Sequence, residues 1–130
     1  MTRPSLVVTS VTLASPAPRE SADFYARLLG VEVAVSESPR PDEPPESGWA
    51  QLKTGTLTLN FEYERHWTPI VWPAEEGHQT STQHLDILVE ELDAAVAWAL
   101  SCGARASDHQ PQDDVRVMLD PVGHTFCLYT

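Results

Sequence analysis

The same order of secondary-structure signals occurs twice along the chain, and this repetition is the strongest constraint on its fold. Each copy has a strand pattern, a helix pattern that ends at a glycine, and then three further strand patterns. The helix patterns cover residues 19–29 and 90–102 and end at Gly30 and Gly103. Two copies do not make a solenoid, which needs three or more. We therefore expect an α+β domain of two βαβββ modules with a cavity where the modules meet.

The clearest strand is residues 83–89, because polar and apolar side chains alternate along it. His84, Asp86 and Leu88 share one face, and Leu85, Ile87 and Val89 share the other. The helix that follows carries an apolar stripe, which we predict to be core: Leu92, Val96, Ala99 and Leu100. This arrangement predicts a packed apolar face and a polar face that presents His84 and Asp86 to a cavity.

The remaining strands and two long connections follow from shorter patterns. The predicted strands are 6–14, 31–35, 49–52 and 56–63 in the first copy, and 104–106, 115–119 and 124–130 in the second. Residues 36–48 contain four prolines and four acidic residues, which predicts a surface loop. The connection 64–82 contains Trp67 and Trp72, so we expect it to pack over a pocket or across a subunit interface. The predicted domain spans 1–130, with modules at about 5–64 and 82–130 and a linker at about 65–81.

Charge and composition exclude several classes of partner. The formal net charge of −11 argues against binding to nucleic acid or to anionic membranes, and it suits either solubility or a cationic ligand. No apolar run is long enough to span a bilayer, and the first residues do not form a signal peptide. We therefore expect a cytoplasmic protein in which Cys102 and Cys127 are free thiols.

The sequence contains no glycine-rich phosphate loop and no CxxC, HExxH or GxSxG motif, so no cofactor is expected from a motif. His84 is a metal ligand, a general base or a wall of a pocket in one interpretation, and a buried structural histidine in the other. Asp86 either orients His84 or is a surface carboxylate. Cys127 is either a nucleophile or a packing residue. Trp49, together with the two linker tryptophans, either lines a ligand site or packs in a core or interface.

Three stretches carry a resemblance to a known superfamily. They are Asp23–Gly30 (DFYARLLG), Gln83–Asp86 (QHLD) followed by Glu91–Ala95 (ELDAA), and Asp120–Leu128 (DPVGHTFCL). In this order and spacing the chain resembles the vicinal oxygen chelate superfamily of glyoxalases, bleomycin resistance proteins and extradiol dioxygenases. The resemblance implies paired βαβββ modules whose mixed sheet curls into a cup. It also implies either a divalent metal that chelates two neighbouring substrate oxygens, or a metal-free cup that holds a drug in a dimer.

The metal positions that the resemblance implies fall on Ser10, Thr58, His84 and Cys127. Only His84 is a standard ligand there, because a hydroxyl does not replace a carboxylate and a thiolate prefers softer metals. Glu62 lies on the strand face of Thr58, so a shifted site of His84 and Glu62 is an alternative. Such a site would hold a divalent Zn, Ni, Mn or Fe ion, and the same two residues are the candidate catalytic pair.

The function predicted from these residues is the binding of an aromatic or cationic small molecule in a cup without the standard metal quartet. The candidate ligand-binding residues are Ser10, Trp49, Thr58, Asn60, Trp67, Trp72, Asp86 and Cys127. The alternatives are a metal-dependent lyase, isomerase or dioxygenase, and a non-catalytic protein with a vestigial cup. A homodimer is expected in all three, with Trp67 and Trp72 at its interface.

Overall fold

The computed structural model describes residues 1–130 and repeats one order of elements. The first module contains β1 (Ser10–Ser15), α1 (Pro18–Leu29), β2 (Val33–Glu37), β3 (Trp49–Lys53) and β4 (Thr58–Tyr63). The second contains β5 (Leu85–Leu88), α2 (Leu92–Cys102), β6 (Arg105–Ala106), β7 (Val115–Leu119) and β8 (Thr125–Tyr129). The prediction of two βαβββ modules is confirmed.

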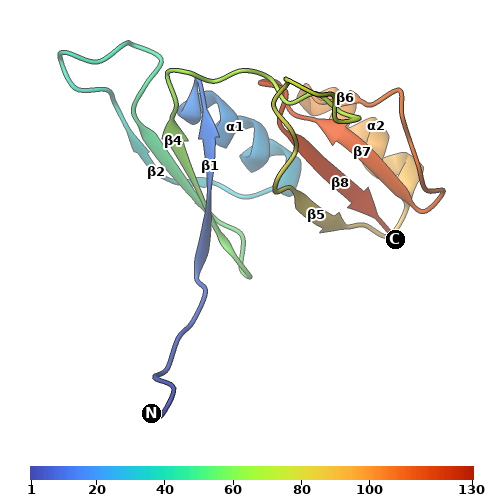
Figure 1. The fold of residues 1–130 in the computed structure, drawn as a ribbon, viewed down its shortest axis with the longest axis horizontal. Helices are drawn as coiled ribbons and strands as arrows, with labels where there is room; N and C mark the ends of the chain where they lie inside the picture. Colours follow the sequence, from blue (N-terminus) through green and yellow to red (C-terminus); the bar gives the residue numbers. More distant parts are fainter.

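Each module folds its strands into a separate four-stranded mixed sheet. The strand orders are β1-β4-β3-β2 and β5-β8-β7-β6, with parallel pairing only between β1 and β4 and between β5 and β8. Figure 1 shows the first sheet at the left and the second at the right, with the linker passing over the top. The first strand of each module therefore lies at an edge of its sheet and has one free side.

One apolar core joins the modules through their helices. The side chains of Phe24 and Tyr25 on α1 are fully buried. The Tyr25 ring stacks on Phe61 of the first sheet at 5.6 Å between centroids and meets Phe126 of the second sheet at 6.0 Å. Helix α2 is tied to α1, because the indole of Trp98 donates a hydrogen bond to the carbonyl oxygen of Leu28 at 3.0 Å. The helices thus cover one face of each sheet. No helix covers the opposite face, which we call the open face of that sheet.

Residues 6–9 do not belong to a strand, although the sequence pattern predicts a strand over 6–14. Leu6, Val7 and Val8 are 72%, 79% and 85% exposed, and the segment extends away from the sheets in Figure 1. The reason is pairing: β4 begins at Thr58, which lies opposite Ser10, so the earlier residues have no neighbouring strand. Local β propensity without a partner does not make a strand.

The apolar stripe of α2 matches the prediction except at Leu100. Ala99 is buried, and Leu92 and Val96 pack against the core, as predicted. Leu100 is 46% exposed, so the prediction of Leu100 as a core residue was wrong. One residue along a helix turns a side chain by about 100°, which carries Leu100 away from the face on which Ala99 is buried.

With 12 and 11 residues, α1 and α2 are too short to cross a lipid bilayer.

Candidate functional site on the second sheet

A pocket of about 150 Å³ lies on the open face of the second sheet. Its floor is β7 and β8, where outward-facing residues alternate with the core residues Met118 and Phe126. The linker and the loop before β7 form its rim. The lining residues are Trp72, Ser81, His84, Pro111, Gln112, Val115, Val117, Thr125 and Cys127. The predicted linker thus packs over a pocket, which is one of the two positions that its sequence left open.

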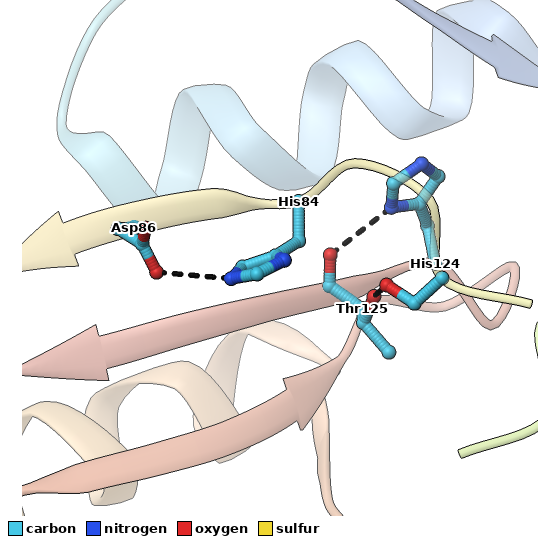
Figure 2. A network of polar contacts seen from close by, with 5 residues as sticks. His84, Asp86, His124 and Thr125 are labelled. Atoms are coloured by element: carbon cyan, nitrogen blue, oxygen red, sulfur yellow. Dashed lines mark hydrogen bonds and ion pairs between the residues drawn. The ribbon is translucent and has the colours of Figure 1, made fainter. Parts of the chain in front are cut away.

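His84 directly precedes β5 and shares the open face with Asp86. The imidazole Nε2 donates a hydrogen bond to Oδ1 of Asp86 at 3.1 Å, as Figure 2 shows. The side chains of His84 and Asp86 are 42% and 62% exposed, so the pair is in contact with solvent. Asp86 is thus an exposed carboxylate that is hydrogen-bonded to the His84 ring, and His84 is not a buried structural histidine.

Cys127 lies beside this pair because β5 and β8 run parallel with Asp86 opposite Cys127. Cys127 is only 8% exposed. Burial raises the pKa of its thiol, and the negative charge of Asp86 raises this pKa further. The thiol is therefore protonated at neutral pH, which disfavours a nucleophilic role for Cys127 in the free protein.

His84, Asp86 and Cys127 together form a group of metal-ligand types. Their ligand atoms all lie within 4.8 Å of one another. An imidazole nitrogen, a carboxylate oxygen and a sulfur atom are all donors found at protein metal sites. In the first module, the positions that the resemblance implies for a metal are Ser10 and Thr58, which lie opposite each other. They fit a metal poorly, because they offer only hydroxyl groups.

Five other predicted site residues lie on the first sheet. Ser10, Trp49, Thr58, Asn60 and Glu62 share its open face, where the side chain of Asn60 accepts a hydrogen bond from Gln51 at 2.9 Å. None of the five lines the pocket that contains His84. The predicted pair of His84 and Glu62 thus falls on two sheets that share no hydrogen-bonded strands.

The strand register corrects the alignment of the two modules. When the two sequence copies are aligned on their helix ends and final strands, Ser10 matches His84 and Thr58 matches Cys127. In the structure, however, Ser10 lies opposite Thr58, whereas Cys127 lies opposite Asp86. The two matches are therefore offset by two residues. A hydrophobic pattern of period two cannot detect this offset, because a shift of two residues keeps every side chain on its face.

The two linker tryptophans have different positions. Trp67 stacks on His124 with 5.9 Å between ring centroids and donates a hydrogen bond to the carbonyl oxygen of Val122 at 3.0 Å. His124 in turn donates from Nδ1 to the carbonyl oxygen of Thr125 at 3.0 Å (Figure 2). Trp72 lines the pocket, and its ring lies 6.1 Å from that of His109. Trp67 thus attaches the linker to the second module, and Trp72 forms one wall of the pocket.

No sequence pattern identifies several of the residues that line the pocket as site residues. Ser81 and Thr125 share a hydrogen bond between their hydroxyl groups, although 44 positions separate them. Val115 and Val117 occupy alternate positions of β7, so their pattern predicts a strand and not a ligand wall. The lining could have been predicted only from the knowledge that the linker covers this face.

Comparisons with known proteins agree with this architecture. The sequence matches the family model of the glyoxalase-like domain over residues 10–129. No curated protein sequence matches the chain significantly. Among solved structures, a glyoxalase family protein from Enterococcus faecalis superposes with a TM-score of 0.68 at 20% identity, covering 95% of this chain and 97% of that chain.

Two fosfomycin resistance proteins named FosX are also similar in structure. A FosX variant from Listeria monocytogenes, solved with Mn(II) and 1S,2S-dihydroxypropylphosphonic acid, has a TM-score of 0.70 at 13% identity and covers 95% of this chain and 90% of that chain. FosX from Mesorhizobium loti has a TM-score of 0.67 at 10% identity, with 99% and 93% covered. At these identities the likeness concerns the fold alone. Since the family model covers nearly the whole chain, this protein belongs to the glyoxalase-like domain family of the vicinal oxygen chelate superfamily.

Proposed function

We propose that the protein binds a small molecule in the pocket on the open face of the second sheet. The observation that carries the proposal is the convergence of Trp72, His84 and Cys127, which come from three separate segments, on one pocket. An aromatic wall with a few polar groups is the usual composition of a ligand site. The standard metal quartet of the superfamily is not part of this proposal.

The size of the pocket limits the ligand. The pocket measures about 150 Å³, and a cavity of about 150 Å³ admits a molecule the size of benzene. Drug-sized ligands occupy roughly 300–1,000 Å³. We therefore expect a compound with one ring, or one ring of a larger compound, to enter the pocket of a single chain.

The chemistry of the walls limits the ligand further. Trp72, Val115 and Val117 offer an apolar surface, and His84 offers an imidazole that is oriented by Asp86. The net charge of −11 attracts cations and repels anions. These features favour an aromatic compound with an amine or amidine substituent, whose ring contacts Trp72 and whose charge lies near Asp86.

The test is a binding measurement on the full chain. Benzylamine and 4-aminopyridine are titrated by calorimetry and by ligand-observed NMR, with benzyl alcohol as the neutral comparison. We expect saturable binding, and we expect His84→Ala to weaken it by about tenfold or more. Added salt should weaken the binding of the amines more than the binding of the alcohol. His78→Ala is the matched control, because His78 is an exposed linker histidine outside the pocket.

A second variant tests the volume of the pocket separately from its polar groups. Val115→Phe fills the space between β7 and the linker without removing a polar group, so it should abolish binding while the fold is retained. Binding that survives Val115→Phe, or a complete lack of saturable binding across the panel, would overturn the proposal.

A second candidate function is metal-dependent catalysis on a substrate with two neighbouring oxygen atoms, as a lyase, isomerase or dioxygenase. The close approach of His84, Asp86 and Cys127 favours it, and one similar FosX structure contains Mn(II). Turnover of a catechol, or of a hemithioacetal with a neighbouring carbonyl group, only after metal is added would support this function. Equal rates with and without a chelator would count against it.

The proposal includes a homodimer. The free edges of β1 and β5 and the exposed segment of Leu6, Val7 and Val8 support association with a second copy. A second copy placed against these edges would also extend the cup beyond the pocket of one chain.

A further inference from the structure

We propose that a groove between β1 and the end of the linker binds a neutral small molecule with amide groups, of the size of a capped dipeptide. The groove has a volume of about 390 Å³, and ligand pockets usually measure about 300–1,000 Å³. It shares no lining residue with the pocket that contains His84. The inference therefore concerns a second site and does not rest on the proposed function.

The groove runs along the edge of β1. Four consecutive residues of this strand, residues 11–14, line it. Because successive side chains of a strand point to opposite faces, a groove that touches four residues in a row follows the edge of the strand and not one face. This edge of the first sheet faces the second module in Figure 1, and no strand pairs with β1 on this side.

The backbone of β1 presents unpaired hydrogen-bonding groups to the groove. The carbonyl oxygen of Ser15 accepts a hydrogen bond from the backbone amide of Glu64, which directly follows β4. The backbone groups of a strand point alternately to its two sides, so the N–H and C=O groups of Thr12 and Ala14 point away from β4. Such an edge binds extended molecules that carry their own amide groups.

The linker side of the groove has further polar groups without a partner. The side-chain oxygen of Gln79 accepts a hydrogen bond from the hydroxyl of Thr68 at 3.1 Å, and that of Gln83 accepts one from Thr82 at 2.9 Å. The NH2 group of each glutamine has no acceptor in the chain. The backbone groups of residues 80–83 make no hydrogen bond within the chain either. The linker thus supplies donors and acceptors opposite the strand edge.

Trp67 and His124 form a stacked aromatic part of the wall, with 5.9 Å between ring centroids. Nδ1 of His124 donates a hydrogen bond to the carbonyl oxygen of Thr125 (Figure 2), so Nε2 of the neutral ring is an acceptor. Val11 and Ile70 add apolar surface to the lining. The groove can therefore contact an apolar side chain of the ligand as well as its amide groups.

The absence of charge in the lining selects a neutral ligand. No acidic or basic side chain lines the groove, although the chain has 19 acidic and 8 basic residues. A charged ligand would lose hydration there without gaining an ion pair, which is unfavourable. An amide has a donor and an acceptor, as each residue of the strand edge does. Residues 11–14 span about 10 Å at the usual rise of a strand, which is the length of a dipeptide with both ends capped.

The experiment is an NMR titration of the isotope-labelled full chain with N-acetyl-alanyl-valinamide. We expect saturable shifts of the backbone amide signals of residues 11–14 and 79–83. An analogue in which an ester oxygen replaces the valine N–H should bind about tenfold more weakly or worse, because a protein acceptor is then left without a donor. The uncapped zwitterionic dipeptide should also bind more weakly than the capped one, because it is charged at both ends.

Three variants remove single groups from the groove. Thr12→Pro removes an N–H at the strand edge and leaves the β1–β4 pairing intact, since proline is tolerated on edge strands. Gln79→Glu and Gln83→Glu each replace an NH2 donor by a carboxylate oxygen. Both glutamines are exposed, so these two variants should fold even if Thr12→Pro does not. Each variant should weaken binding of the capped dipeptide by about tenfold or more.

Matched controls make the same changes outside the groove. Ser10→Pro removes a backbone N–H from the same edge of β1, and Gln51→Glu changes a glutamine on the first sheet. Neither residue lines the groove. Both controls should bind the capped dipeptide as the unmodified chain does.

Three results would overturn the proposal. They are no saturable shifts at the groove, equal binding of the amide and its ester analogue, and unchanged binding in both glutamine variants. A second copy of the chain is the rival occupant of this edge. Sedimentation velocity that shows weaker self-association in Thr12→Pro, together with no binding of the capped dipeptide, would place the second copy there and would also overturn the proposal.

Discussion

The hydroxyl of Tyr25 and the carboxylate of Asp120 connect the two modules inside the protein. Tyr25 on α1 donates a hydrogen bond to Oδ2 of Asp120 at 2.8 Å, across 95 positions of sequence. Oδ1 of Asp120 accepts hydrogen bonds from the backbone amides of Val122 and His124 at 3.0 and 2.9 Å. One carboxylate therefore closes the turn between β7 and β8 and holds it against the helix of the other module.

The protonation of Asp120 should make stability depend on pH. Burial raises the pKa of Asp120 above its ordinary value of 3.8, and the hydrogen bonds from His124, Tyr25 and Val122 oppose that rise. A carboxyl group with a raised pKa binds its proton more tightly in the folded chain than in the unfolded chain. Its contribution to the free energy of unfolding therefore falls as pH rises from the ordinary value through the raised value.

Asp120→Asn removes this titration and keeps an oxygen for the two backbone amides. Urea unfolding of both proteins from about pH 4 to about pH 7 should show the unmodified protein losing stability relative to Asp120→Asn as the pH rises. The difference in the free energy of unfolding between the two proteins could instead stay constant, or change in favour of the unmodified protein, as the pH rises. Either result would mean that the hydrogen bonds to Asp120 affect its pKa at least as strongly as burial does.

At the scale of elements, the sharp turn into β3 depends on one glycine. Gly48 has a positive φ of 97°, and a Cβ there would overlap the carbonyl oxygen of Glu37 at the end of β2. The preceding loop is fixed to α1, because Arg19 donates hydrogen bonds to the carbonyl oxygens of Ser47 and Pro45 at 3.1 and 2.7 Å. The proline-rich surface loop is therefore anchored at its C-terminal end, where neither backbone can move aside easily.

Gly48→Ala should accordingly destabilise the protein more than Gly55→Ala. Gly55 has a similar φ of 93° but no atom within 4 Å of a Cβ, so it measures backbone strain alone. We expect Gly48→Ala to lower the free energy of unfolding by about 1–3 kcal/mol more than Gly55→Ala, which is the usual effect of overpacking. Chemical denaturation of both variants checks this, and equal losses would show that β2 yields to the added methyl group.

At the scale of the whole molecule, the modules share a core on the helix side but do not share a sheet. The first strand of each module remains an edge strand, and Leu88 on β5 is 69% exposed. A groove of about 510 Å³ lies between the end of α1, the β3–β4 hairpin and β5. These apolar surfaces are exposed to solvent in a single chain. Exposed apolar surfaces of this kind are typical of protein–protein interaction sites.

Replacing Leu6, Val7 and Val8 together by Ser should therefore weaken self-association. Full burial of one such side chain contributes about 1.5–3 kcal/mol. The loss of even one fully buried side chain should therefore raise the dimer dissociation constant by about tenfold or more. Sedimentation velocity at several concentrations measures this. Leu100→Ser is the control for an exposed apolar residue elsewhere. A strictly monomeric unmodified chain would show that the edges remain free in solution.

The sequence alone determined the elements and their order, because hydrophobic periodicity is a local property. The alternation around His84 and Asp86 correctly predicted their shared face, and the residues of β7 were predicted at the observed bounds. The prediction of a strand failed where the alternation was present but no neighbouring strand was available to pair with it. Residues 6–9 read as a strand, yet no strand of the chain lies beside them.

Only the tertiary structure decided which outward-facing residues meet. Periodicity assigns a side chain to a face but does not say what covers that face. The convergence of Trp72 with His84, the pairing of Asp86 with Cys127 and the contact of Tyr25 with Asp120 all depend on segments far apart in the chain. These contacts are set by how the linker crosses the second sheet, by strand register and by how the helices pack, and none of these is encoded in a local pattern.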